Sequence, residues 1–317
     1  MGDDYQREAT PEEIDQMRDL LRASLRAGAN GFTSSHGPHV DMNDVPVASR
    51  FSTRDELKAL ATVMGEENVG VYQMSTKTLR LGLHEDERAF LEDLSRTTRR
   101  PATINGLEHR KENCAGWLEW LDQAAKRGAR MRSNVQVMGI EGRFLFNTLN
   151  IANQRSPKLV ELARLPADEA VARLASPEYR AEIRQEMLDL PKESLLKPSW
   201  DKCWVGRPVL EKNAHLEGKS VADLARAANK ETVDYVLDLA IEERMGTEFQ
   251  FGVVHDGSPD LARAVATSPY TLLGVSDGGA HLGSQSTIHV STYFLGEWIR
   301  GLQLMPLEEA VRKLTFV

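Results

Sequence analysis

Apolar residues recur at helical spacing near the start of the chain, and a short strand-like run follows them. The segment 10–27 begins with Thr10 as a helix N-cap, and Glu13 three positions later completes the pattern of a capping box. Residues 31–35 then have the pattern of a short strand. Five apolar residues share one face of the predicted helix: Ile14, Met17, Leu20, Leu21 and Leu25.

The same alternation of helix and strand continues along the chain. Helices are predicted at 53–65, 85–97, 115–127 and 259–267, and strands at 70–74, 101–106, 129–137 and 271–277. Strands separated by helices of this length are typical of right-handed βαβ units. The pattern therefore predicts an α/β fold with a parallel sheet of about five strands.

The segment from about 139 to 258 does not continue this alternation of helices and strands. It contains predicted helices near 157–165, 178–189, 219–229 and 231–243. We interpret it as an elaborated, helical connection that caps the sheet, so that residues 1–317 form one domain. The last predicted helix, 306–317, has no Gly or Asn after it, which favours a truncated chain.

Composition excludes several classes of protein. With 41% hydrophobic and 27% charged residues, the chain has the composition of a globular protein, and its net charge of −8 disfavours nucleic acid and anionic lipid as partners. No apolar run is long enough to span a bilayer. Cys114 and Cys203 are far apart and form no CxxC, which suits a reducing cytoplasm. We therefore expect a cytoplasmic protein.

The sequence GVSDGGAH at 274–281 is the richest candidate site. A predicted strand delivers Ser276 and Asp277 to its carboxyl end, where parallel α/β folds build their active sites. A carboxylate there can bind a metal ion or act as a general base, although Asp-Gly is also a common turn pair. His281 could lie at the same site or be exposed to solvent.

A second candidate is SSHGPH at 34–39, where two histidines follow a strand end. Histidine is a metal ligand and a proton shuttle, but a three-residue separation across a Gly-Pro turn does not fix both rings on one ion. His36 is therefore a candidate substrate contact, with a polar loop as the alternative. Asn105 ends another strand and could contact substrate or cap a helix. No P-loop, dinucleotide or α/β-hydrolase motif is present.

Several blocks of sequence resemble a known family. LLGVSDGGAH (272–281), GEWIR (296–300) and MPLEEAVRKLT (305–315) are similar to the amidohydrolase superfamily, specifically its D-aminoacylase or N-acyl-D-amino-acid deacylase branch. AGANGFTSS (27–35) and HLEGKSVADLARA (215–227) are similar to that branch as well. The resemblance thus runs over most of the chain.

This resemblance implies a fold. The family has a (β/α)8 TIM-type barrel with its metal site at the carboxyl ends of the strands. If 271–277 is the eighth strand, the four earlier strands are the fourth to seventh, and the insertion at 139–258 follows the seventh. The expected fold is thus an incomplete barrel without strands one to three, which also explains why the family's HxH pair is absent from this sequence.

The resemblance also assigns roles to residues. Asp277 matches the eighth-strand aspartate that binds metal and takes a proton from the attacking water. The histidines expected at the ends of strands five and six fall near Met74-Ser75 and Asn105-Gly106, neither of which contains a histidine. We therefore expect one divalent ion, zinc, and not two.

The implied function is metal-dependent hydrolysis of a carbon–nitrogen bond other than a peptide bond, in a small N-acyl amino acid or related amide. Asp277 would be the catalytic base, and four residues would contact substrate: His281, His36, Asn105 and Ser276. The alternative is an amidohydrolase-like protein without metal or catalysis, which binds a ligand or serves in an assembly. A homo-oligomer, the exact substrate and its stereochemistry stay open.

Overall fold

The computed structural model divides into two compact units. Unit 1 comprises Met1–Val137, His255–Val275 and Val290–Val317, and unit 2 comprises Met138–Val254 and Ser276–His289. Within the described residues, no helix combines the length and the apolar composition that crossing a bilayer requires. The structure describes residues 4–37, 39, 45–75, 84–104, 111–135, 137, 140–149, 156–189, 202–253, 259–274, 276, 285–286 and 288–316.

Unit 1 is built on a five-stranded parallel sheet, as predicted. The strands follow the order β1-β2-β3-β4-β8, and every neighbouring pair is parallel. Among the described residues, β3, β4 and β8 keep their ladder bonds over three to five positions, and residues 105, 106, 136, 275 and 277 of the predicted strands lie outside the described residues. The bounds are β1 (Gly31–Ser35), β2 (Val71–Ser75), β3 (Ala102–Ile104), β4 (Met131–Val135) and β8 (Thr271–Leu273).

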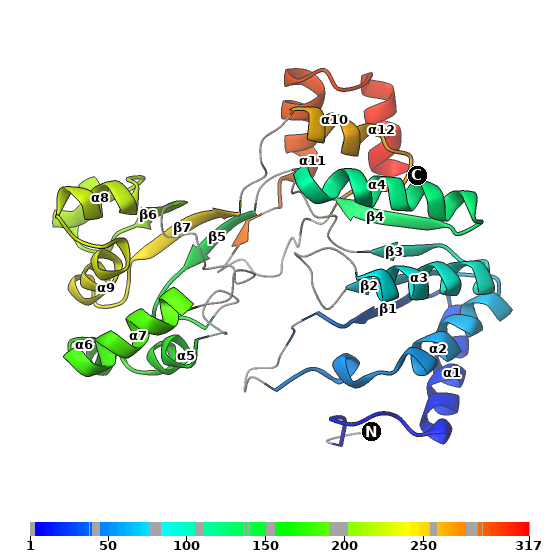
Figure 1. Cartoon of the computed structure of the whole chain (residues 1–317), viewed down its shortest axis with the longest axis horizontal. Coiled ribbons are helices and arrows are strands. Elements are labelled where there is room, and N and C mark those ends of the chain that lie inside the picture. Colours follow the sequence, from blue (N-terminus) through cyan, green and yellow to red (C-terminus); the bar gives the residue numbers. More distant parts are fainter. Residues whose placement is uncertain are drawn as a thin grey trace. The chain divides into compact units, whose positions relative to one another are not determined.

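Helices pack against one face of this sheet (Figure 1). The predicted capping box of α1 is confirmed, with Thr10 and Glu13 bonding each other's backbone. Leu20, predicted on the buried face, is 69% exposed, because α1 packs through Leu21 and Leu25 instead. The helices are α1 (Pro11–Arg26), α2 (Arg54–Glu66), α3 (Glu85–Thr98), α4 (Lys111–Lys126), α10 (Pro259–Thr267), α11 (Val290–Tyr293) and α12 (Leu307–Thr315), with a 3-10 turn over Ala48–Phe51 and a π-helix over Phe294–Gly301.

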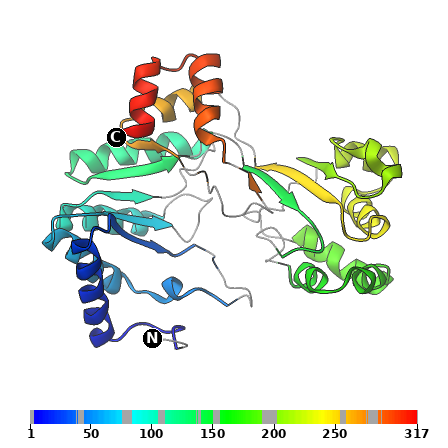
Figure 2. The same cartoon turned by 180° about the vertical axis from the view of Figure 1, so that it is seen from behind.

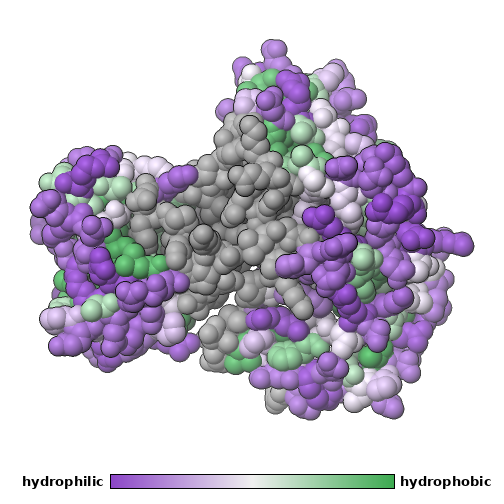
Figure 3. Space-filling view, viewed as in Figure 1, coloured by the Kyte–Doolittle hydropathy of each residue, from purple (hydrophilic) through white to green (hydrophobic). Residues whose placement is uncertain are grey.

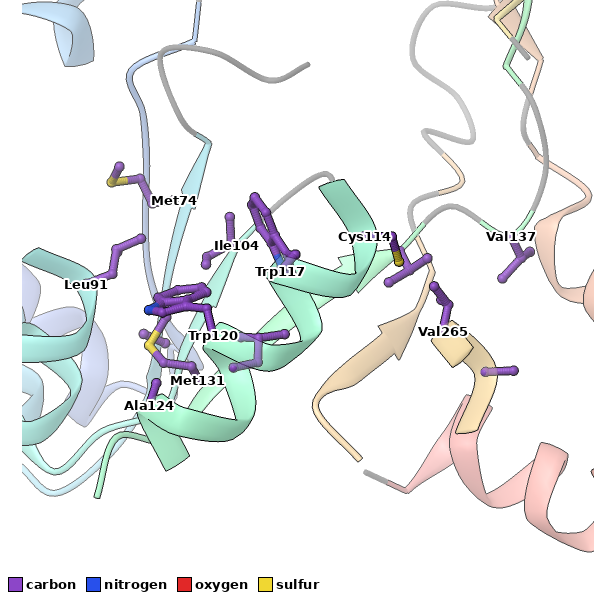
Figure 4. Close-up of a cluster of buried hydrophobic side chains, with 14 of the residues drawn as sticks. Met74, Leu91, Ile104, Cys114, Trp117, Trp120, Ala124, Met131, Val137 and Val265 are labelled. Atoms are coloured by element: carbon purple, nitrogen blue, oxygen red, sulfur yellow. The ribbon is translucent and has the colours of Figure 1, made fainter. Parts of the chain in front are cut away.

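The core of unit 1 lies between the sheet and these helices. Alternate residues of the strands point to the helices and are fully buried, including Ile104 and Met131. From α4, Trp117 and Trp120 reach over them, with their ring centroids 6.0 Å apart in an edge-to-face pair (Figure 4). Each large apolar side chain buried in this way stabilises the unit by about 1.5–3 kcal/mol. Hydrophilic side chains cover much of the outer surface in the view of Figure 3.

A buried lysine makes the stability of unit 1 depend on pH. Lys313 of α12 is 8% exposed and donates a hydrogen bond to the Ser268 carbonyl oxygen. Burial, with smaller contributions from Arg312 and Arg132, lowers the pKa of Lys313 from 10.5 to about 8. Because the unfolded chain holds this proton up to a higher pH, we expect the free energy of unfolding to rise between pH 8 and pH 10, by about 2 kcal/mol.

Urea unfolding at pH 7, 8, 9 and 10 measures this gain. Lys313→Met should remove it, whereas Lys126→Met, at an exposed position, should keep it. Burial raises the pKa of Tyr72 to about 12, so the tyrosine lowers stability only above its ordinary pKa of 10. The raised pKa of the Cys203 thiol in unit 2 lowers stability above pH 9 in every variant, so the contribution of Lys313 is read from the difference between wild type and Lys313→Met. Equal pH profiles for wild type and Lys313→Met would show that Lys313 carries no such shift.

Unit 2 contains an antiparallel sheet that the sequence pattern does not predict (Figure 2). Its strand order is β6-β7-β5-β9, with β5 (Ile140–Phe144), β6 (Cys203–Arg207), β7 (Glu248–Val253) and β9 (Gln285–Ser286). The predicted helices are present, with one more at α6. They are α5 (Pro157–Arg164), α6 (Ala167–Leu174), α7 (Pro177–Asp189), α8 (Val221–Ala227) and α9 (Thr232–Glu242), and a 3-10 helix spans Glu211–Leu216. The segment expected as a helical connection is therefore an α+β unit.

Unit 2 has a hydrophobic core of its own. Phe146 packs edge-to-face on Phe144 and Phe249, at centroid distances of 4.8 Å and 6.2 Å. Cys203 lies in the same core, and burial raises the pKa of its thiol to about 12, which keeps it protonated and unreactive. The independent core explains why this segment forms a compact unit where a connection capping one domain was expected.

Candidate functional site

The carboxyl ends of the parallel strands in unit 1 meet at one edge of the sheet. β1 ends at Ser35, β2 at Ser75, β4 at Val135 and β8 at Leu273. Gly274 extends the last pairing by donating from its backbone N–H to the Val135 carbonyl, at 3.2 Å. This is the edge at which parallel α/β folds place their active sites.

The sheet face opposite the helices is polar. Register pairs Thr33 with Gln73 and Thr103 with Arg132, on the residues that alternate with the buried core positions. Thr33 is exposed and Arg132 is half-buried. Burial lowers the pKa of Arg132, whose guanidinium stacks on the Tyr270 ring at 5.6 Å. Such a face can receive a polar molecule, whereas the opposite face is filled by apolar side chains.

His36 directly follows β1 and is fixed at both its backbone and its ring. Its backbone N–H donates to the Ser75 carbonyl oxygen at 2.8 Å, which extends the pairing of β1 with β2. Its Nε2 lies 2.8 Å from the Ser52 hydroxyl, and that hydroxyl donates to the Ser49 carbonyl oxygen at 2.7 Å. Because Ser52 has one hydrogen to donate, its oxygen accepts from His36 Nε2–H, and neutral His36 carries its lone pair on Nδ1.

His39 bonds to a different serine. Its Nδ1 lies 2.7 Å from Ser35 Oγ, which also accepts the Gly37 backbone N–H at 3.3 Å. The His39 side chain is exposed, and Ser35 is half-buried. The two histidines of SSHGPH therefore each pair with a separate hydroxyl at the end of β1.

A buried tyrosine supports this strand end from the core side. The Tyr72 hydroxyl lies 2.9 Å from Ser34 Oγ, and the side chain is fully buried. Burial raises the pKa of Tyr72 to about 12, partly offset by the bond to Ser34. The phenol therefore stays neutral and holds β1 and β2 together beneath the polar residues.

The structure describes part of the predicted site. It places His36 beside Ser35, Ser52 and Ser75. Ser276 is half-buried and groups with unit 2. The other predicted site residues lie outside the described residues: Asp277, His281 and Asn105.

Ser49 and Ser52 are site residues that the sequence pattern does not reveal. Hydroxyl side chains in a loop carry no periodicity, and the bonds of Ser49 and Ser52 depend on the way the turn before α2 folds back on β1. The available signal was the presence of four serines within residues 34–52.

The described residues can be tested for a metal site. Among them, no three His, Cys, Asp or Glu side chains are placed to hold a metal ion. At the end of β2, where the family resemblance expects a histidine, Met74 is buried in the core and Ser75 closes the strand. A thioether turned into the core and a hydroxyl do not fit a two-ion centre. A single ion would depend on Asp277 and its surroundings.

Comparison with known proteins identifies solved structures with this fold. One is a D-aminoacylase described by the functional role of its binuclear metal centre, with one-metal activation and second-metal attenuation, and another is a D-aminoacylase mutant in complex with 100 mM CuCl2. Each matches with a TM-score of 0.51 and 16% identity over 99% of this chain and 53% of the other. This chain therefore spans about half their length, and its resemblance to D-aminoacylase is confirmed in fold. No protein-family model and no curated protein matches the sequence.

Proposed function

We propose that this chain carries the catalytic half of a metal-dependent amidohydrolase, which hydrolyses the carbon–nitrogen bond of a small amide such as an N-acyl amino acid. The observation that supports this best is the parallel sheet, with β8 leading into Ser276 and Asp277 and with the fold of D-aminoacylase along almost the whole chain. In this proposal β1, β2, β3, β4 and β8 are strands four to eight of a (β/α)8 barrel, and residues 139–258, which form most of unit 2, are the insertion after the seventh strand.

Asp277 is the proposed catalytic residue. A divalent ion such as zinc, bound at its carboxylate, would polarise the amide carbonyl and activate the attacking water. The Asp277 carboxylate would accept the proton of that water and pass it to the leaving nitrogen. His36, Asn105, Ser276 and His281 are the proposed substrate contacts.

One ion is proposed, not two. Met74 and Ser75 at the end of β2 do not supply the ligand that a second ion needs. One D-aminoacylase structure is described by one-metal activation and second-metal attenuation, which supports a centre with one ion. The described residues thus favour a centre with one metal ion.

Asp277→Asn tests the proposal. In assays with N-acetyl-D- and N-acetyl-L-amino acids and added zinc, we expect the variant to lose at least about a hundredfold in kcat, because it cannot accept the proton. Asp260→Asn, at an exposed position on α10, is the matched control and should retain activity. Hydrolysis by Asp277→Asn at the wild-type rate would refute the role of Asp277.

A second candidate function is ligand binding without catalysis. The residues at the end of β2 favour it, because neither is a metal ligand of the expected kind. Calorimetry with an N-acetyl amino acid, together with metal analysis, separates the two proposals. Binding without turnover and with less than one zinc per chain supports the non-catalytic protein, whereas stoichiometric zinc and turnover support the enzyme.

A further inference from the structure

We propose that Ser35 and His39 form a nucleophile–base pair that accepts an acyl group from an aryl ester. This would be a reaction separate from the amide hydrolysis proposed at Asp277. Ser35 Oγ and His39 Nδ1 are 2.7 Å apart, within the range of an activated serine and its base. The pair lies at the carboxyl end of β1, on the edge of the sheet where catalytic groups are found in parallel folds.

The position of the hydroxyl hydrogen distinguishes this pair from its neighbour. Ser35 Oγ accepts the Gly37 N–H through one lone pair and lies 2.7 Å from His39 Nδ1, a contact in which either atom can supply the hydrogen. In the proposed pair Ser35 donates to His39 Nδ1, which makes the imidazole the base. In the other pair, the hydrogen of Ser52 goes to the Ser49 carbonyl oxygen, and His36 acts as a donor. Ser35 is therefore poised to give up its proton to a histidine, and Ser52 is not.

Backbone contacts hold the pair in place. The Ser49 hydroxyl donates to the Ser35 carbonyl oxygen at 2.7 Å, and the Val47 N–H donates to the His39 carbonyl oxygen at 3.3 Å. The next residue after Ser35 is tied to Ser75 of β2 through its N–H. These bonds fix the backbone on both sides of the pair, so little ordering is needed before reaction. His39 is exposed and Ser35 is half-buried.

The proposed reaction consumes only the ester and one water molecule. Ser35 Oγ attacks the ester carbonyl carbon while His39 Nδ1 takes the hydroxyl proton. The bond between the carbonyl carbon and the aryl oxygen breaks, and the phenol leaves with that proton. Water then attacks the acyl-serine, His39 takes a proton from the water, and the serine oxygen recovers it as the carboxylic acid departs. An aryl ester suits the site because its leaving phenolate needs little help from the protein.

Acetylation by p-nitrophenyl acetate tests the pair. With EDTA present, we expect a burst of p-nitrophenol, one acetyl group per chain by intact mass, and the acetyl on the peptide that contains Ser35. Ser35→Ala should lose the burst and the label. His39→Gln should slow acylation at least tenfold, because the amide cannot take the proton. Ser24→Ala, at an exposed serine of α1, should keep the label at Ser35.

The outcomes decide the proposal even if Ser35→Ala does not fold. Acetyl groups found in wild type on lysines alone, or acylation of His39→Gln at the wild-type rate, would overturn it. EDTA separates this reaction from the proposed amide hydrolysis. A labelled Ser35 without amide turnover would support the pair and count against the function at Asp277, and the reverse result would do the opposite.

Discussion

Replacing Gly31 with alanine is expected to destabilise unit 1 by about 3–5 kcal/mol, at the upper end for a single overpacking substitution. β1 and β2 approach closely where they begin, and Gly31 is directly paired with Val71. A Cβ on Gly31 would overlap the Val71 carbonyl oxygen and lie 2.7 Å from its nitrogen and 3.0 Å from its carbonyl carbon. All three atoms belong to the backbone of the ladder, so the strands would have to separate to admit the methyl group.

Hydrogen exchange read by mass spectrometry measures this effect in each unit separately. Protection in β1 and β2 should fall by several orders of magnitude in Gly31→Ala, and the strands of unit 2 should keep their protection. Gly116→Ala is the control. Gly116 is exposed in α4 and a Cβ there meets nothing within 4 Å, so alanine should stabilise the helix by about 0.5–1 kcal/mol. Unchanged protection in Gly31→Ala would show that the sheet can relax at this point.

The helices and strands of unit 1 were predictable because their signals are local. Thr10 and Glu13 mark the start of α1 within a single turn, and Thr53 caps α2 in the same position relative to its helix. Each strand of the parallel sheet is a short segment that follows a helix, and the order of strands follows the order of the chain. In unit 1 local propensity and tertiary structure agree, so the pattern of apolar and polar residues is enough to predict these helices and strands.

The sheet of unit 2 was not predictable because its strands depend on distant partners. β5 pairs with β7, and Gly142 lies directly opposite Phe251, whose ring occupies the space where a Cβ would be. A glycine in the middle of a strand weakens the local strand signal. The aromatic ring that compensates for it is more than a hundred residues away in the chain.

The same distinction between local and distant signals applies to the candidate site. The sequence points to His36 because SSHGPH follows a strand, and the structure places it at the strand end as expected. It does not reveal that His36 and His39 bond to different serines, because Ser52 comes from the turn before α2. The role of Asp277 is still a prediction, since its surroundings lie outside the described residues.

Replacing Glu243 with alanine is expected to destabilise unit 2 by about 3–4 kcal/mol. Glu243 is 2% exposed at the end of α9, and its carboxylate accepts from the backbone N–H groups of Val209 and Leu210 and from Asn213 Nδ2, the last at 2.6 Å. The substitution leaves three donors without an acceptor in a place that water reaches poorly, and each such loss costs about 1–3 kcal/mol before relaxation. It also detaches the 3-10 helix Glu211–Leu216 from α9.

The neighbouring residue provides the control for this prediction. Glu242 has the same side chain on the same helix, but it is exposed and bonds Lys212 at 2.6 Å. Glu242→Ala should therefore cost less than about 1 kcal/mol, as exposed ion pairs do. Urea unfolding of the two variants compares a buried carboxylate that accepts three hydrogen bonds with an exposed one that forms an ion pair. Similar losses in both would mean that the Glu243 donors find water when the carboxylate is removed, and that the turn holds without it.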